Sequence, residues 1–350
     1  MKRHIIPVFV PHYGCPHQCV FCNQHKITGS GTTMTAEYAK DIIQEALSWQ
    51  THSVEKEVAF YGGSFTAIPI SVQKELLSVV SPLYQDGMIH GVRLSTRPDA
   101  IDDVILKSLQ EHHVSTIELG VQSMDDAVLR AANRGHTSDD VRGAVEKIRQ
   151  YPFALGLQIM PGLPSEDMYS LLKTANAVRE LAPDFVRIYP TVVIDDTPLA
   201  DAYKGGTYTP LTLKEATMRT AFLKLFFERA NIPVIRMGLQ ATTDLDREGT
   251  VLAGPYHPAF GELVESELFR QMLMRTLYGE DIEGKYLTIH HHPSDASKVR
   301  GQKRANLTWL KQAYGVAQVV CTADGKKQGE LMLEWERSQR VINLSMIDTI

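Results

Sequence analysis

The chain has 350 residues, of which 43% are hydrophobic and 22% are charged, and its formal net charge at pH 7 is -5. This composition is typical of a folded globular protein and excludes a mainly disordered or collagen-like chain. The negative net charge gives no general attraction to nucleic acid, so an RNA partner would need a local basic surface. The first apolar run, Ile5–Val10, is too short for a signal peptide or a membrane span. We therefore expect a cytoplasmic protein without a membrane partner.

Three of the four cysteines follow this first apolar run. Cys15, Cys19 and Cys22 lie within eight residues, in the spacing Cys-x3-Cys-x2-Cys, and Phe21 directly precedes the last of them. Three thiolates on one short loop can hold three irons of a cubane cluster and leave the fourth iron open to another ligand. The pattern therefore indicates an iron-sulfur site.

Two other interpretations of the cysteine loop stay open at this point. A closed zinc site could take its fourth ligand from His12, His17 or His25, and a plain electron-transfer cluster is the second alternative. Cys321 stands alone near the other end and is predicted to be a buried strand residue. The cysteines therefore do not indicate a disulfide framework.

Apolar, β-branched segments alternate with helical patterns over the first 240 residues, which predicts a parallel sheet with helices outside it. Strands are expected at Ile5–Val10, Glu57–Tyr61, Gly91–Thr96, Thr116–Val121, Leu155–Met160 and Phe185–Tyr189, with a plausible seventh at Val234–Gly238. Capping-box patterns at Thr137–Asp140 and Thr212–Glu215 predict helix starts. The fold class is thus α/β, a partial TIM-like barrel of six strand-helix units. The segment 191–210, with Gly205, Gly206 and two prolines, is interpreted as a long loop covering the barrel mouth.

The pattern changes after about residue 240, so we predict one domain over 1–240 and a C-terminal extension with a small α+β unit over 241–350. The extension is expected to hold a helix at Glu262–Tyr278, a strand at Tyr286–His291, a helix at Ser297–Tyr314, a strand at Gly315–Cys321, and a hairpin at Asp324–Gly325 leading to Leu331–Trp335.

Two groups of polar residues in this extension have both a functional and an ordinary interpretation. Arg300, Arg304 and Lys311 recur at spacings that share one face of the predicted helix, with Lys298 and Lys303 beside them, and they could contact RNA or simply face solvent. His290, His291 and His292 could bind phosphate or a metal, or be partly exposed residues without a role.

The catalytic residues of a parallel barrel lie at the C-terminal ends of its strands. After the second predicted strand come Gly62, Gly63 and Ser64, where two glycines allow the backbone to approach a ligand closely, although a tight turn would also explain them. The third strand ends in Ser95 and the string TRPD (96–99). The fourth ends in ELGVQS (118–123), followed by NRGHT (133–137). The fifth leads to MPGLP (160–164) and the sixth to YPTVVI (189–194).

The cysteine spacing resembles the signature of the radical S-adenosylmethionine (SAM) superfamily. The five strings, in this order, resemble the radical SAM half of the Elongator catalytic subunit, and more distantly oxygen-independent coproporphyrinogen dehydrogenase; together they span about residues 5–240. This resemblance implies a radical SAM partial barrel with a 4Fe-4S cluster and SAM as cofactors. It also implies an enzyme that reductively cleaves SAM to a deoxyadenosyl radical.

The resemblance also implies roles for individual residues. Cluster ligation falls to Cys15, Cys19 and Cys22, and the SAM contacts fall to Phe21, Gly62, Gly63, Ser64, Ser95, Gln122, Arg134 and Gln158. The planar fork of Arg134 suits the SAM carboxylate, although a surface ion pair with Asp139 or Asp140 is the alternative. Gln122 and Gln158 could instead be satisfied polar residues inside the barrel.

The chain departs from these families at three points. Elongator-like chains carry an acidic residue at the position of Ser95, and the haem enzyme carries an aspartate at that of Gln158. The chain leaves no room for Elongator's acetyltransferase domain, so no acetyl-coenzyme A is expected. The expected substrate is RNA, for example a tRNA base, with a reductase or ferredoxin as electron donor. The alternatives are a radical SAM enzyme or haem-binding relative acting on a small molecule such as a tetrapyrrole, and a non-catalytic metal-binding module.

Overall fold

The computed structural model describes residues 3–10, 15, 17–23, 26, 34–49, 55–324 and 327–347. The chain separates into two compact units, one formed by residues 1–212 with 232–256 and the other by residues 213–231 with 257–350. The second unit thus includes one segment that precedes residue 240, while the domain boundary at residue 240 stays a prediction. None of the described helices is long and apolar enough to cross a membrane.

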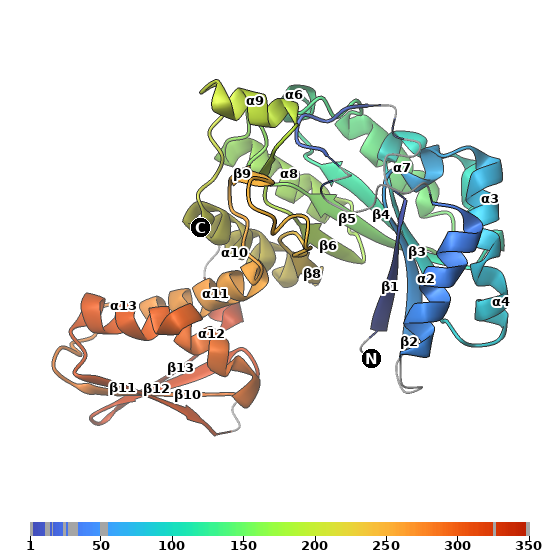
Figure 1. Ribbon diagram of the computed structural model, residues 1–350. Helices are drawn as coiled ribbons and strands as arrows, with labels where there is room; N and C mark the ends of the chain where they lie inside the picture. Colours follow the sequence, from blue (N-terminus) through green and yellow to red (C-terminus); the bar gives the residue numbers. More distant parts are fainter. Residues whose placement is uncertain are drawn as a thin grey trace. The chain divides into compact units, whose positions relative to one another are not determined.

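The first unit is built on a curved parallel sheet (Figure 1). Within the described residues this sheet has seven strands in the order β1-β2-β3-β4-β5-β6-β8, and every neighbouring pair is parallel. The strands are β1 (Arg3–Val10), β2 (Glu55–Gly62), β3 (Gly91–Thr96), β4 (Val114–Gln122), β5 (Ala154–Ile159), β6 (Phe185–Ile188) and β8 (Val234–Met237). The predicted partial barrel is confirmed, including its seventh strand.

Helices connect successive strands of this sheet. They are α2 (Ala36–Ser48), α3 (Ile70–Ser78), α4 (Val80–Gln85), α5 (Asp103–Glu111), α6 (Asp126–Ala131), α7 (Ser138–Ile148) and α8 (Met168–Glu180). The predicted capping box is present at α7, where the Thr137 side chain accepts from the Asp140 N–H and the Asp140 carboxylate accepts from the Thr137 N–H. Such reciprocal bonds satisfy two backbone donors at a helix start, which is why the chain turns helical there.

Side chains alternate between two environments along each strand, as a period of two requires. On β4, Ile117, Leu119 and Val121 are fully buried, whereas Glu118 and Gln122 line a cavity on the other face. Residues on β1 alternate in the same way, with Ile6, Val8 and Val10 buried. One face of the sheet therefore holds the apolar core, and the other presents polar groups.

The segment 191–210 is not the uninterrupted loop that the sequence predicts. It contains β7 (Val193–Ile194), which pairs antiparallel with β9 (Val251–Ala253), and the helix α9 (Pro198–Lys204). The Thr197 side chain accepts from the Ala200 N–H and Pro198 occupies the first turn, two features that begin a helix. The prediction was wrong because this short helix lacks a long apolar period.

The second unit is an α+β structure, as predicted. Its sheet has the order β11-β10-β12-β13 within the described residues, with β10 and β11 parallel and the other pairs antiparallel. Its elements are α10 (Leu213–Arg229), α11 (Phe260–Thr276), β10 (Tyr286–His291), α12 (Ala296–Arg300), α13 (Ala305–Tyr314), β11 (Gln318–Ala323), β12 (Glu330–Trp335) and β13 (Ser338–Asn343). The hairpin predicted at Asp324–Gly325 includes residues outside the described ranges.

The predicted helix Ser297–Tyr314 is in fact two helices, α12 and α13, separated by a turn. Arg300, Arg304 and Lys311 therefore do not share one face of a single helix. Gly301, Lys303 and Arg304 have φ angles of 72°, 50° and 63°, which are incompatible with a continuous right-handed helix. The strand predicted at 315–321 begins later, at Gln318, because Gly315 (φ 63°) ends α13.

The three consecutive histidines have three different environments. The Nδ1 of His290 lies 2.6 Å from an Asp324 carboxylate oxygen and its Nε2 lies 3.1 Å from a Glu334 oxygen. His291 is fully buried, and the His292 side chain accepts from the Ser294 N–H. Since both ring nitrogens of His290 already face carboxylates, this residue is not arranged to bind phosphate or a metal.

Candidate functional site

One cavity in the first unit is lined by every candidate site residue of the sequence analysis. Its volume is about 1360 Å³, and it opens at the C-terminal ends of the parallel strands. The candidate residues along its wall are Cys15, Cys19, Phe21, Cys22, Gly62, Gly63, Ser64, Ser95, Gln122, Arg134 and Gln158. Residues from five strands and their following loops thus meet in one place, as expected for the catalytic end of a parallel barrel.

The cysteine loop is attached to the barrel through its backbone. The Val20 N–H donates to the Ala132 carbonyl at 3.1 Å, and the Leu199 N–H donates to the Val20 carbonyl at 2.8 Å. The Asn133 amide also donates to the Gln18 carbonyl at 2.8 Å. The loop is therefore held between the end of α6 and the start of α9, the helix that the sequence analysis missed.

Apolar contacts add to this attachment. Val20 and Phe21 pack against a buried cluster around Val128 and Leu163, and also against Leu199. Burial of an aromatic side chain between two clusters favours one position of the loop over others. Phe21 therefore has a packing role here in addition to lining the cavity.

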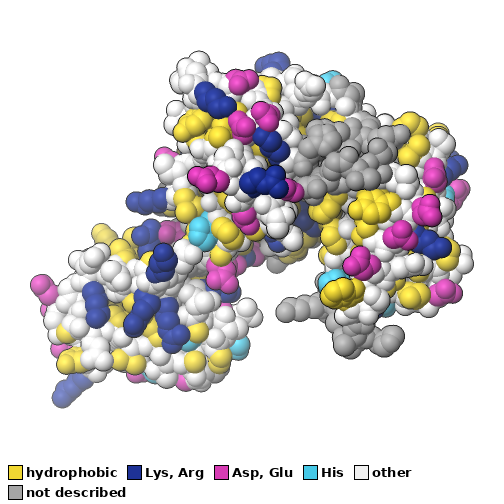
Figure 2. All heavy atoms as spheres, in the orientation of Figure 1, with side chains coloured by type: hydrophobic (Ala, Val, Ile, Leu, Met, Phe, Trp, Pro, Cys, Tyr) yellow, Lys and Arg dark blue, Asp and Glu magenta, His cyan; other side chains and the backbone are white. Residues whose placement is uncertain are grey.

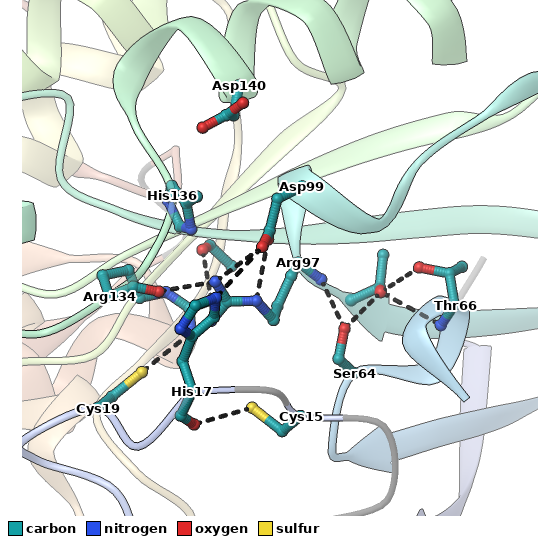
Figure 3. A network of polar contacts seen from close by, with 12 residues as sticks. Cys15, His17, Cys19, Ser64, Thr66, Arg97, Asp99, Arg134, His136 and Asp140 are labelled. Carbon is teal, nitrogen blue, oxygen red and sulfur yellow. Dashed lines mark hydrogen bonds and ion pairs between the residues drawn. The ribbon is translucent and has the colours of Figure 1, made fainter. Parts of the chain in front are cut away.

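The thiols of the cysteine loop contact different neighbours (Figure 3). The Cys15 thiol lies 3.4 Å from the His17 carbonyl, and the Cys19 sulfur accepts from Arg134 Nη1 at 3.3 Å. No three His, Cys, Asp or Glu side chains among the described residues are gathered closely enough to hold a metal ion. All three cysteines line the same cavity, which places them on the wall of one site.

Of the three alternative zinc ligands, the structure describes His17 alone. His12 and His25 lie outside the described residues. The Nε2 of His17 lies 4.0 Å from an Asp99 carboxylate oxygen, and no fourth ligand joins the cysteines among the residues described.

Arg134 is buried at the cavity wall and does not form the surface ion pair considered as its alternative. Its side chain is 7% exposed, and its Nη2 donates to the Gly120 carbonyl at 2.8 Å. Its Nε is buried without a hydrogen-bond partner in the described part of the chain. A buried guanidinium with an unused donor is suited to an incoming carboxylate, because leaving that donor unpaired is unfavourable.

Gly62 and Gly63 form a turn directly against β1. The Gly63 N–H donates to the Val10 carbonyl at 2.8 Å, and Gly62 has a φ of 108°. A Cβ at Gly62 would lie 3.3 Å from three Val10 backbone atoms. Both the conformation and the close approach require glycine at this position, so the turn has a structural cause even before any ligand is considered.

Three residues next to this turn were not singled out from the sequence. The Thr96 hydroxyl lies 3.0 Å from the Ser64 hydroxyl, and the Arg97 N–H donates to that same Ser64 oxygen at 3.2 Å. The Arg97 guanidinium donates to both Asp99 oxygens, at 2.9 and 3.0 Å, and to the Arg134 carbonyl at 2.7 Å (Figure 3). Thr96, Arg97 and Asp99 belong to the string TRPD and connect the glycine turn with the Arg134 loop.

Gln122 and Gln158 form a pair on neighbouring strands. The Gln158 amide donates to the Gln122 side-chain oxygen at 3.2 Å, and both residues line the cavity. Gln122 has a φ of 67° at the end of β4, an uncommon conformation for a residue other than glycine. Such local strain is found preferentially at functional sites, which favours a ligand contact over a purely structural role.

A buried network of charges lies deeper in the same cavity. Arg93 donates from Nε to Glu57 at 2.8 Å and from Nη1 to Glu118 at 3.1 Å. Arg187 donates to Glu118 at 3.0 Å and to the Tyr61 hydroxyl at 2.9 Å. Burial is the main cause that raises the pKa of Tyr61, so its hydroxyl stays protonated at neutral pH.

This network was not predicted from the sequence. The available signal was that charged residues occur inside predicted buried strands, a pattern expected only if they pair with one another. The pairing itself depends on residues from four strands.

His136 follows Arg134 by two residues and is neutral in the folded protein. Burial lowers its pKa to about 4, and the nearby charges of Arg134 and Arg97 act in the same direction. Its Nε2 lies 3.2 Å from the Val121 carbonyl and its Nδ1 is buried without a partner in the described structure, so the ring donates through Nε2.

The low pKa of His136 predicts a loss of stability in mild acid. Below about pH 6.5 the unfolded chain binds a proton at this histidine, whereas the folded protein does not until about pH 4. The stability that neutral His136 contributes is fully present above pH 6.5. It is lost as the pH falls from about 6.5 to about 4, which lowers the free energy of unfolding by about 3 kcal/mol. Urea unfolding of the wild type and of His136→Asn at several pH values measures it. Identical pH dependence in the two proteins would contradict the assignment.

Comparison with known proteins gives the following similarities. The family model of the radical SAM superfamily matches residues 9–178, and that of the radical SAM C-terminal domain matches residues 183–270. An uncharacterized protein of Methanocaldococcus jannaschii is 29% identical over 57% of this chain and 64% of its own length. A tRNA uridine(34) acetyltransferase of Dehalococcoides mccartyi is 27% identical over 56% of this chain and 50% of its own length. A haem chaperone, HemW, of Lactococcus lactis is 25% identical over 55% of this chain and 50% of its own length.

Among solved structures, archaeal Elp3 of Methanocaldococcus infernus, lacking residues 1–46, superposes with a TM-score of 0.59 at 20% identity. The match covers 76% of this chain and 62% of that one, and it shows a shared fold. The chain spans between half and two thirds of the length of each of these relatives. Their complete activities therefore do not transfer with the match.

Proposed function

Because this chain belongs to the radical SAM superfamily of enzymes, we propose that it cleaves SAM reductively at a 4Fe-4S cluster and uses that chemistry to modify RNA, with a tRNA base as the target. The observation that supports the proposal is the single cavity that is lined by the three cysteines, the glycine turn, the glutamine pair and Arg134. When bound, the cluster and SAM supply a one-electron cleavage of a carbon-sulfur bond.

In this proposal Cys15, Cys19 and Cys22 hold the cluster. Arg134 binds the SAM carboxylate through its buried, unpaired Nε, and the glycine turn receives the amino group through its backbone carbonyls. The described parts of the cysteine loop are fixed by backbone bonds from α6 and α9, so the ligands are oriented before the cofactors bind.

The remaining cavity residues would orient the rest of SAM. Gln122 can donate and accept at once, and its bond to Gln158 fixes its rotamer. The hydroxyls of Ser64 and Ser95 are short donors and acceptors suited to a ribose, and Phe21 supplies an apolar wall. Both serines line the cavity, which supports these assignments.

The RNA substrate is supported by the relative named as a tRNA uridine(34) acetyltransferase. The match to that relative covers half of its length, so the proposal extends only to a radical step and includes no acetyl-coenzyme A. The electron for the cluster would come from a reductase or ferredoxin, and the proposed location is the cytoplasm. The proposed domains are the barrel over 1–240 and the extension over 241–350.

A second candidate function is supported by the relative named as a haem chaperone. In this alternative the cavity would serve chemistry on a small molecule such as a tetrapyrrole, or the chain would carry haem. Haem titration followed by absorbance distinguishes it from the RNA proposal, because tight stoichiometric haem binding without RNA-dependent turnover would favour the alternative.

The proposed function is tested by anaerobic incubation of cluster-loaded protein with dithionite and SAM. We expect deoxyadenosine and methionine in equal amounts, measured by chromatography, and a modified base when unmodified tRNA is added. Absence of deoxyadenosine from fully loaded protein would overturn the catalytic proposal. Deoxyadenosine formation without any RNA product over a complete set of tRNAs would overturn the RNA substrate while leaving the radical chemistry in place.

A further inference from the structure

The second unit has a basic stretch that the proposed cavity does not use. Residues 296–323 contain five lysines or arginines and no acidic residue, in a chain whose net charge is -5. The stretch covers α12, the turn after it, α13 and β11. Figure 2 shows Lys and Arg side chains gathered over the helices of this unit.

Four of these cations are exposed and lack an acidic partner. Arg300, Lys303, Arg304 and Lys311, which we call the basic surface, form no ion pair with any described residue. Their neighbour Lys298 differs, because its ammonium lies 3.5 Å from Glu265 and 3.3 Å from Asp295. The positive charge of the basic surface is therefore available to an anionic partner.

The backbone of the turn is held in an uncommon conformation. Lys303 and Arg304 are consecutive residues with φ angles of 50° and 63°, a region in which glycine or asparagine would be less strained. The chain instead places two cationic side chains there. Residues held in such conformations are found preferentially at binding and active sites, so the turn is a candidate for one.

The turn is rigidly attached to the helices beneath it. Asn306 is buried, and its amide donates to the Ser266 and Lys298 carbonyls at 3.0 and 3.2 Å. A Cβ at Gly301 would lie 2.9 Å from the Ser266 hydroxyl and 3.0 Å from the Asn306 nitrogen. Glycine therefore lets the turn lie directly on α11, and the basic side chains start from a fixed backbone.

The turn joins two helices that lie between two paired strands in the chain order. β10, α12, α13 and β11 form a strand-helix-helix-strand unit whose two strands are parallel neighbours, and a four-residue turn, Gly301–Arg304, joins the helices. KH domains use a short glycine-containing loop between two helices to hold the backbone of four nucleotides. Only the order of the elements is compared with a KH domain. The charge of the turn and its positive φ angles are observations on this chain itself.

We propose that the basic surface binds the phosphates of single-stranded RNA and presents that RNA to the enzyme as a docking site separate from the catalytic cavity. The inference rests on the proposed function for its choice of RNA over other polyanions. Lys303 and Arg304 are adjacent in the turn, and Arg300 at the end of α12 and Lys311 in α13 add two further exposed cations that a phosphate backbone could contact. A surface of this kind contacts the phosphate backbone of the RNA and therefore has little preference for its base sequence.

The test measures binding of a fluorescein-labelled oligouridine by anisotropy, using the cluster-loaded full chain and the double variant Lys303→Gly with Arg304→Gly. Glycine is the least strained residue at positive φ, so this variant removes charge without endangering the fold. We expect affinity at low salt to fall by about tenfold or more. The slope of log affinity against log salt should decrease by about 0.7 for each phosphate contact removed.

A matched control is Lys327→Ala with Arg337→Ala, which removes two exposed cations of the same unit outside the basic surface and should leave binding unchanged. Equal affinity of wild type and the glycine variant, or equal loss in the control, would overturn the proposal. So would tighter binding to anionic lipid vesicles than to oligouridine. Deoxyadenosine formation without RNA, measured on the same samples, should be equal in all variants. Its absence from the wild type would refute the proposed function while leaving the binding result interpretable.

Discussion

Replacing Cys19 by alanine is expected to abolish loading of the iron-sulfur cluster and to reduce deoxyadenosine formation to background. Cys19 is the most buried of the three loop cysteines at 4% exposure, and its sulfur accepts a hydrogen bond from Arg134 at 3.3 Å. Loss of its thiolate leaves two protein ligands on the loop, too few to hold a cubane that normally has three or four. Iron and acid-labile sulfide content, the visible absorbance of anaerobic protein, and deoxyadenosine yield measure the effect.

The matched control is Cys321→Ala. Cys321 is a half-buried, unpaired cysteine on β11 in the second unit and does not line the cavity. This variant should retain both the cluster and SAM cleavage. If Cys19→Ala kept a full complement of iron and sulfide, the ligand assignment would be wrong. If anaerobically purified wild type held zinc and no sulfide, the cysteine loop would be a structural metal site instead.

Replacing Glu118 by alanine is expected to lower the free energy of unfolding by about 3–5 kcal/mol. Glu118 is 3% exposed and faces two guanidinium groups, those of Arg93 and Arg187, together with the Tyr61 hydroxyl. Removing the carboxylate leaves Arg187 without a charged partner among the described residues and leaves Arg93 with Glu57 alone. The cost of an uncompensated buried charge dominates the effect. Urea unfolding followed by circular dichroism gives the difference.

Two further variants show whether the loss of stability in Glu118→Ala comes from the charge and the burial of Glu118. Lys173→Ala removes an ion pair with Asp125 from a side chain that is 49% exposed, and it should cost less than about 1 kcal/mol. Glu118→Gln keeps an acceptor for the Tyr61 and arginine donors but removes the charge, so its cost should lie between the other two. A Glu118→Ala variant no less stable than Lys173→Ala would contradict the network as described.

The two proposals assign different tasks to the cavity and to the basic surface. In the proposed function the cavity binds a cluster and SAM, and Arg93 and Arg187 on its wall are already paired with a carboxylate. Because Arg93 and Arg187 are paired with Glu118, they offer little free positive charge to a polyanionic substrate in the cavity. A separate basic surface in the second unit would solve this problem, which is why the two proposals are tested by independent measurements.

Much of the site could be predicted from the sequence because the relevant signals are local. Cys15, Cys19 and Cys22 are close in space since they are close in the chain, and the glycine turn follows β2 directly. Gln122 and Gln158 lie at the C-terminal ends of parallel strands, and parallel strands bring such ends to one edge of the sheet. The alternation of apolar residues was enough to predict that sheet.

The Gly301–Arg304 turn shows where local signals failed. The sequence prediction treats residues 297–314 as one helix, although positions 300–304 contain no apolar residue. Asn306 and Gly301 instead fix a break by contacting Ser266, a residue about forty positions away. Helix α9 was missed because it is too short to show a long apolar period, and its Leu199 N–H donates to Val20 of the distant cysteine loop, a contact that no local signal specifies.

The sequence by itself therefore determined the parallel sheet and the residues at the strand ends, and it predicts the cysteine ligand set, since each depends on spacing within a short segment or on strand direction alone. Only the tertiary structure decided which buried charges pair, how the cysteine loop is held, and where the basic residues of the second unit are exposed. These features depend on contacts between segments that lie far apart in the sequence. Glu118 reaches Arg187 across 69 residues of sequence through such neighbours, and nothing local to either residue specifies that contact.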